Sequence, residues 1–159
     1  MGRTQTYRAL GGSPSRADYD GLIETQVPSR TTSVYTRFNF SIPDQSTINS
    51  FDTLSLNVRY DDGFVAYLNG TRVASPNGPA NPSWNSTATE QNPDNSARNF
   101  EAIDISSSLD QLRVGNNVLA IQLLNTGTTS SDLLLDPQLV GGNSGALISP
   151  SARAYSSTI

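Results

Sequence analysis

Apolar residues alternate with polar residues along two stretches of the chain, and this alternation restricts the possible fold more than any other feature of the sequence. In the segment 33–42, SVYTRFNFSI, one set of alternate positions is mostly apolar and the other is polar. The first set consists of Val34, Thr36, Phe38, Phe40 and Ile42. The segment 51–60, FDTLSLNVRY, repeats the pattern with Leu54, Leu56, Val58 and Tyr60. A period of two residues is typical of a β-strand with one buried face, so both segments are predicted to be half-buried strands.

Further strands and turns follow these segments. We interpret 52–75 as a three-strand meander, with Asp61-Asp62-Gly63 at its first corner and Asn69-Gly70, a type I′ hairpin signal, at its second. The segment 76–99 contains four prolines and no apolar periodicity, so it is expected to form a long loop. The segment 116–125, NNVLAIQLLN, is apolar on both faces, which is typical of a central, covered strand.

These elements predict an all-β fold, a two-sheet antiparallel β-sandwich of jelly-roll type with one short helical turn near 106–113. A length of 159 residues suits one domain with a sizeable core. We expect an N-terminal segment at 1–19, the sandwich at 20–141, and a C-terminal linker or tail at 142–159.

The composition excludes most common kinds of active site. The chain has no Cys, no His and no Lys, so thiolates, imidazole ligands and Schiff-base chemistry are absent. An enzyme would therefore depend on carboxylates, and we do not expect an enzyme.

The net charge of −4 argues against nucleic acid as a partner. No apolar run is long enough to predict a membrane span.

Asp61 and Asp62 are the candidate metal ligands. Two neighbouring carboxylates at a strand corner could bind Ca²⁺, completed by backbone carbonyl groups and Asn side chains of loops. Alternatively, Asp and Gly occur here because a corner favours residues that bond their own backbone and tolerate positive φ. Adjacent strand residues point to opposite faces, so both carboxylates reach one ion only if the corner is irregular. Asp132 and Asp136 either cap a turn or join such a calcium site.

The long loop contains the candidate ligand-binding residues. Trp84 could form an aromatic platform for a sugar ring, with Arg72, Asn81 and Asn85 as hydrogen-bonding neighbours. The alternative is that Trp84 anchors the loop onto the sandwich.

Other polar residues could contact a ligand or take part in catalysis. Tyr35, Arg37 and Arg59 lie on outward faces, where they could contact a glycan or be solvated or covered by a neighbouring strand. Glu101 and Asp104 fall on opposite faces of one predicted strand, so they do not make a catalytic pair.

Four segments carry a family resemblance: RYDDGFVAYLNGTRVA, PSWNSTAT, FEAIDISSSLDQLRVGNNVLAIQLLN and SSDLLLDPQLVG. Between about Asp20 and Gly141 the chain resembles the galactose-binding-domain-like β-sandwich modules of large secreted bacterial proteins. The resemblance implies a jelly-roll sandwich with an extracellular, accessory role and no defined ligand. The DDG…YLNG portion is also similar to protective-antigen-type adhesin sandwiches, which implies calcium held by adjacent aspartates in contact with sugar.

Three function hypotheses follow. The leading one is a non-catalytic, secreted or cell-surface module that binds carbohydrate, with glycans and the other domains of a parent protein as partners and Ca²⁺ as a structural ion. The alternative is a structural, assembly or adhesive module whose sheet edges or termini (1–12 and 142–159) pair with neighbouring subunits, giving a homo-oligomer or filament. The third is a carboxylate-based hydrolase, which would need a cleft with two converging carboxylates.

Overall fold

The computed structural model describes residues 10–11, 19, 22, 25–28, 30–130 and 132–142 of the chain. In chain order its elements are β1 (Leu10–Gly11), β2 (Thr25–Gln26), β3 (Ser33–Ile42), α1 (Gln45–Asn49), β4 (Thr53–Asp61), β5 (Gly63–Leu68), β6 (Thr71–Ala74), α2 (Asp94–Ala97), β7 (Glu101–Asp104), the 3-10 helix η1 (Ser106–Gln111), β8 (Gly115–Leu124) and β9 (Leu134–Gly142). Most of the predicted segment 1–19 and nearly all of 142–159 lie outside the described residues, so the hypotheses about the termini remain predictions.

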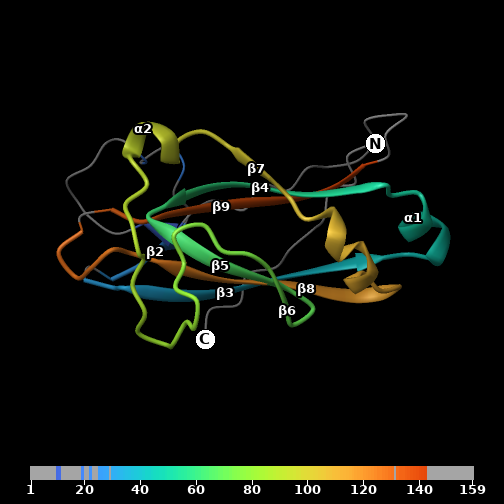
Figure 1. The fold of residues 1–159 in the computed structure, drawn as a ribbon, viewed down its shortest axis with the longest axis horizontal. Helices are drawn as coiled ribbons and strands as arrows, with labels where there is room; N and C mark the ends of the chain where they lie inside the picture. Colours follow the sequence, from blue (N-terminus) through green and yellow to red (C-terminus); the bar gives the residue numbers. More distant parts are fainter. Residues whose placement is uncertain are drawn as a thin grey trace.

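Two antiparallel sheets pack face to face, which confirms the predicted β-sandwich (Figure 1). One sheet has the strand order β3-β8-β5-β6 and the other has the order β7-β4-β9. The chain passes from one sheet to the other at most connections, as in a jelly roll. Among the described strands of the two sheets, only β5 and β6 form a local hairpin. The predicted helical turn is η1.

The core lies between the sheets, on the faces that the alternation predicted. β3 alternates between buried and exposed residues along its whole length, and the inward side chains of β4 are buried. β8 lies between β3 and β5 and is therefore central, as predicted. Burial of apolar side chains on this scale is the main source of the free energy of folding.

The predicted meander at 52–75 is wrong. β4 pairs with β7 and β9, whereas β5 pairs with β6 and β8, so Asp61-Asp62-Gly63 joins the two sheets instead of two neighbouring strands. Alternation shows which residues face the core, but two strands on opposite sheets alternate in the same way as two strands that pair. The second corner is confirmed as a hairpin, with φ of 50° at Asn69 and 93° at Gly70.

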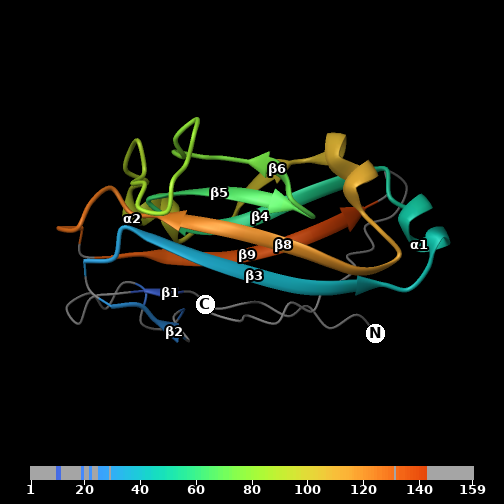
Figure 2. The ribbon, with the colours of Figure 1, turned by 90° about the horizontal axis from the view of Figure 1, so that it is seen from below.

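The two ends of the sandwich differ (Figure 2). The crossover from β4 to β5, helix α2 and the loop before β9 lie at one end, and α1 with η1 lies at the other. No helix in the described ranges is long and apolar enough to cross a membrane.

Candidate functional site

Asp61 ends β4 at the crossover, and its carboxyl group is buried, with 2% of the residue exposed. The hydroxyl group of Tyr19 donates a hydrogen bond to Asp61 Oδ2 at 2.8 Å. Burial raises the pKa of Asp61 to about 8, the nearby charges of Asp62 and Asp132 add to the increase, and the bond from Tyr19 opposes it. The pKa of Tyr19 is also raised, first by its own burial and then by its bond to Asp61.

The carboxyl group of Asp62 has a different set of partners. Its Oδ2 accepts hydrogen bonds from the backbone N–H of Thr126 at 2.9 Å and from the Thr126 hydroxyl group at 2.8 Å. Its Oδ1 accepts a longer bond of 3.3 Å from the backbone N–H of Asn92. Asp62 therefore ties two loops of this end to the crossover, whereas Asp61 is oriented toward other acidic groups.

Asp61, Asp94 and Asp132 each place one carboxylate oxygen in a common group, in which the three atoms lie within 4.8 Å of one another. Asp61 is buried, and Asp94 and Asp132 are half-buried. Carboxylate oxygens are the ligands that Ca²⁺ prefers, so this donor set fits the ion that the sequence suggested. The structure brings Asp61 and Asp132 together as the calcium hypothesis requires, but Asp62 is not part of the group.

The sequence analysis does not identify Asp94, although it lies in the segment 76–99 that is predicted to be a long loop. It is the first residue of the short helix α2, which follows Pro93. The only signal was the presence of an acidic residue in a long loop that was already expected to be functional. Its distance in sequence from Asp61 concealed the contact.

The loop after β6 packs against the outer face of the four-stranded sheet. Ala88 forms a small buried cluster with Val65 and Leu124, and its N–H donates to the carbonyl oxygen of Asn125 at 2.9 Å. Arg72 holds the start of the loop by donating to the carbonyl oxygen of Ala80 at 2.7 Å, and to Pro79 O and Ser75 Oγ. The loop is therefore well attached without using Trp84.

Trp84 is 78% exposed, so it does not anchor the loop and that alternative is wrong. The residue before it is fixed instead, because Gln122 Nε2 donates to the carbonyl oxygen of Ser83 at 2.7 Å. Gln122 is itself buried, with 3% exposed, near the end of strand β8. Trp84 is thus an exposed aromatic side chain next to a rigid attachment point.

The predicted neighbours of Trp84 occupy different positions. Asn85 and Asn81 are exposed, and Asn85 Oδ1 accepts a bond of 2.9 Å from Ser83 Oγ. Arg72 points its guanidinium group at the loop backbone, so its contribution to a ligand site would be to hold the loop.

The outward residues of the early strands also differ from one another. Tyr35 is 49% exposed and pairs across the sheet with Gln122, the residue that holds Ser83. Arg37 is exposed on the same strand. Arg59 lies on the other sheet, where its guanidinium group donates to the buried Asp136 at 3.2 Å. Among these candidates, only Tyr35 and Trp84 contribute an exposed aromatic side chain to the four-stranded sheet and its loop.

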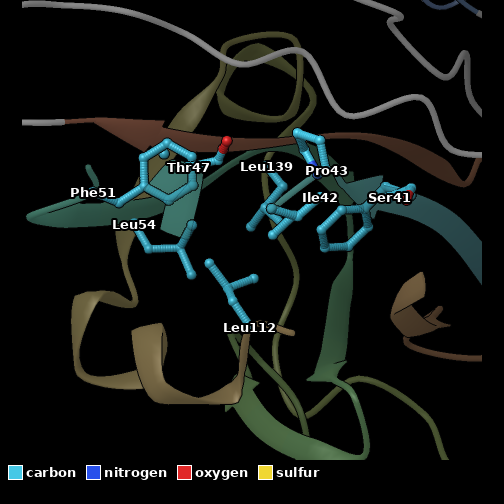
Figure 3. Close-up of a pocket in the computed structure, with 10 residues that line it drawn as sticks. Ser41, Ile42, Pro43, Thr47, Phe51, Leu54, Leu112 and Leu139 are labelled. Atoms are coloured by element: carbon cyan, nitrogen blue, oxygen red, sulfur yellow. The ribbon is translucent and has the colours of Figure 1, made fainter. Parts of the chain in front are cut away.

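A small apolar hollow opens at the α1 end of the sandwich (Figure 3). The side chains of Phe51, Leu54 and Leu112 point toward it, and its volume is about 90 Å³. Small-molecule sites usually have volumes of roughly 300–1,000 Å³ and a few convergent polar groups. This hollow is consequently an incompletely filled end of the core, not a candidate binding site.

Comparisons with known proteins do not identify a family. No family model matches the sequence, and no curated protein matches it. Among solved structures, the chain is similar to α-L-rhamnosidases from Streptomyces avermitilis (19% identity, TM-score 0.48, 80% of this chain) and Dictyoglomus thermophilum (17%, 0.47, 79%). A third, from Aspergillus terreus, has 19% identity and a TM-score of 0.45 over 80% of this chain. The chain spans 10%, 12% and 15% of the lengths of these three enzymes, and similarity at this level establishes neither a family nor an activity.

Proposed function

We propose that this chain is a non-catalytic, carbohydrate-binding β-sandwich module of the galactose-binding-like type, acting outside the cell as one domain of a larger protein. The observation that carries the proposal is the 78% exposure of Trp84 beside a fixed attachment point. An exposed indole ring loses little conformational entropy on binding and offers an apolar face to the C–H groups of a sugar. The exposed Tyr35, next to Gln122 on the sheet, extends the same surface.

The first experiment uses the fact that Trp84 is the single Trp of the chain. Its intrinsic fluorescence therefore reports on this loop alone. We expect a shift in emission when a bound oligosaccharide covers the indole ring, measured across a panel of plant and bacterial polysaccharide fragments. Retention on an insoluble polysaccharide, measured by pull-down, should be lost in Trp84→Ala.

The Trp84→Ala variant separates binding from folding. Because the side chain is exposed, its removal should change the free energy of unfolding by no more than about 0.5 kcal/mol. Tyr35→Ala should weaken retention less than Trp84→Ala, because a smaller part of Tyr35 is exposed. Emission that no glycan shifts, together with equal retention of wild type and Trp84→Ala, would contradict the proposal.

Assembly through a sheet edge is the second candidate function, and strand β3 favours it. β3 has ten residues and pairs on one side only, with β8, among the described strands. A long edge offers unpaired backbone groups to another strand. A chain that binds no glycan and has an oligomeric molar mass in light scattering would support this candidate over carbohydrate binding.

We propose that the group formed by Asp61, Asp94 and Asp132 binds a structural Ca²⁺ that joins the crossover, α2 and the loop before β9. The support is the convergence of three carboxylate oxygens from distant parts of the chain, one of them on a buried residue. A cation at this position would favour the ionised form of Asp61, which burial otherwise disfavours.

A further inference from the structure

A hollow lined mostly by polar residues lies between α2, the start of β7 and the end of β4. Its volume is about 360 Å³. It is lined by Tyr60, Asn92, Ser96, Asn99, Phe100 and Glu101. This volume falls within the range of roughly 300–1,000 Å³ that is usual for small-molecule sites. None of the lining residues is basic, and Trp84 is not among them.

A fixed carboxylate forms one wall of the hollow. Glu101 is exposed, and its Oε2 accepts a hydrogen bond of 2.8 Å from the hydroxyl group of Tyr60, whose side chain is buried in the core. Glu101 pairs with Val58 across the sheet, so it lies on the same face as the core residues. The bond from Tyr60 positions the carboxylate and leaves its second oxygen for a ligand.

Two amide side chains are also positioned in advance. Asn92 Nδ2 donates to the carbonyl oxygen of Tyr60 at 2.8 Å, and Asn99 Nδ2 donates to the carbonyl oxygen of Asn95 at 2.7 Å. Both bonds use the donor end of the amide and orient its oxygen as an acceptor. The hydroxyl group of Ser96 can donate or accept.

Phe100 adds an apolar surface to these polar groups. The residue is 37% exposed, and the Arg59 guanidinium group covers one side of its ring, 4.1 Å from the ring centre. Arg59 is in turn held by the buried Asp136, so the ring is supported from behind. The exposed part of the ring is available for contact with C–H groups of a ligand.

We propose that this hollow binds one neutral sugar ring, as a second site separate from the surface around Trp84. A sugar ring presents hydroxyl groups at its edge and C–H groups on its face, and the hollow offers oxygen acceptors and an aromatic ring. An anionic ligand would be repelled by Glu101, and an apolar ligand would offer no hydrogen bond to the amide oxygens or to the second carboxylate oxygen. The ligand class rests on the proposed carbohydrate-binding function, but the residues and the readout are independent of Trp84.

The experiment is a titration of the ¹⁵N-labelled full chain with D-glucose, D-galactose, D-mannose and L-rhamnose, followed by amide chemical shifts. We expect one of these sugars to shift the amides of residues 92–101. Glu101→Gln should weaken that binding by about tenfold, because a hydrogen bond to a charged group is replaced by a neutral one. Glu90→Gln is the matched control, since Glu90 is exposed and does not line the hollow, and it should bind as wild type does.

The readouts separate this inference from the proposed function. Shifts at 92–101 that persist in Trp84→Ala and weaken in Glu101→Gln support a site in the hollow. A response of Trp84 fluorescence without chemical-shift changes at 92–101 would overturn the proposal that the hollow binds a sugar, and would leave the proposed function intact. Chemical-shift changes at 92–101 with equal affinity in wild type and Glu101→Gln would also overturn the sugar site in the hollow. No response at the hollow or at Trp84 would overturn both the sugar site and the proposed function.

Discussion

Gly63 illustrates how much of the crossover is determined by the space available to single residues. Gly63 is not among the glycines with positive φ, which are Gly70 and Gly115 in the described part of the chain. The expectation that this corner needs a glycine for positive φ is therefore wrong. A Cβ atom at Gly63 would lie 2.9 Å from both Cβ and the carbonyl oxygen of Asn77. The glycine is needed because the loop after β6 passes directly over the corner.

The substitution Gly63→Ala should lower the free energy of unfolding by about 1–3 kcal/mol, because one of the clashing atoms belongs to the backbone and cannot move away easily. Chemical denaturation measures the change. Gly127→Ala is the matched control, because a Cβ atom there meets nothing within 4 Å, and it should be neutral or stabilising by about 0.4–1 kcal/mol. Equal stability of both variants would show that the loop does not pack on Gly63 as described.

Asn69 connects elements as well as forming the β5–β6 turn. Its Nδ2 donates to Gln111 O at 2.7 Å and to Asn117 Oδ1 at 2.8 Å, and its Oδ1 accepts from the Val118 N–H at 2.8 Å. The side chain thereby joins the hairpin to η1 and β8. Asn117 is fully buried and completes the network by bonding both the N–H and the carbonyl oxygen of Arg113.

Two variants of Asn69 should separate the turn from this network. Asn69→Gly keeps the positive φ accessible but removes three hydrogen bonds, so we expect it to destabilise the fold by about 1–3 kcal/mol. Asn69→Ala should cost about 1–2 kcal/mol more, because alanine also resists the left-handed conformation. Thermal and chemical unfolding measure both values. A Gly variant as stable as wild type would show that the turn alone matters.

At the scale of the whole molecule, local sequence patterns correctly predicted the strands and which of their faces are buried. They did not predict which segments, far apart in the sequence, lie side by side. Alternation placed Phe38, Leu56 and Val58 in the core, where they are buried. The same alternation is silent about which sheet a strand joins, so β4 and β5 were assigned to one meander. The acidic group shows the same limit. Asp61 was identified from its neighbour in sequence, whereas its spatial neighbour Asp94 is separated from it by two strands and a long loop.

The acidic end of the sandwich should make stability depend on pH and calcium together. The pKa of Asp61 is about 8 in the folded chain and near the ordinary value of 3.8 after unfolding. Between these values the folded state holds a proton that the unfolded state has lost, so in chelator the stability should fall as pH rises, by at most about 1.4 kcal/mol per pH unit. Asp44 and Asp104 have lowered pKa values, because of hydrogen bonds from Ser46 and Ser106 respectively. These two groups make the stability rise with pH, but only below the ordinary pKa of an aspartate.

Calcium should remove the fall in stability with rising pH, because a bound cation stabilises the ionised carboxylate of Asp61. Calcium at about 100 times its dissociation constant should add about 2.7 kcal/mol, or a rise in Tm of several degrees, at pH 8 and less at pH 5. Asp61→Asn should abolish both the pH dependence and the calcium response in differential scanning calorimetry. Asp110→Asn, which removes an exposed carboxylate on η1, should retain both. A pH dependence in chelator that calcium leaves unchanged would mean that Asp61 is buried and protonated but binds no ion. Without an ion, this end of the sandwich would then be most stable at a pH where the carboxyl group of Asp61 is neutral.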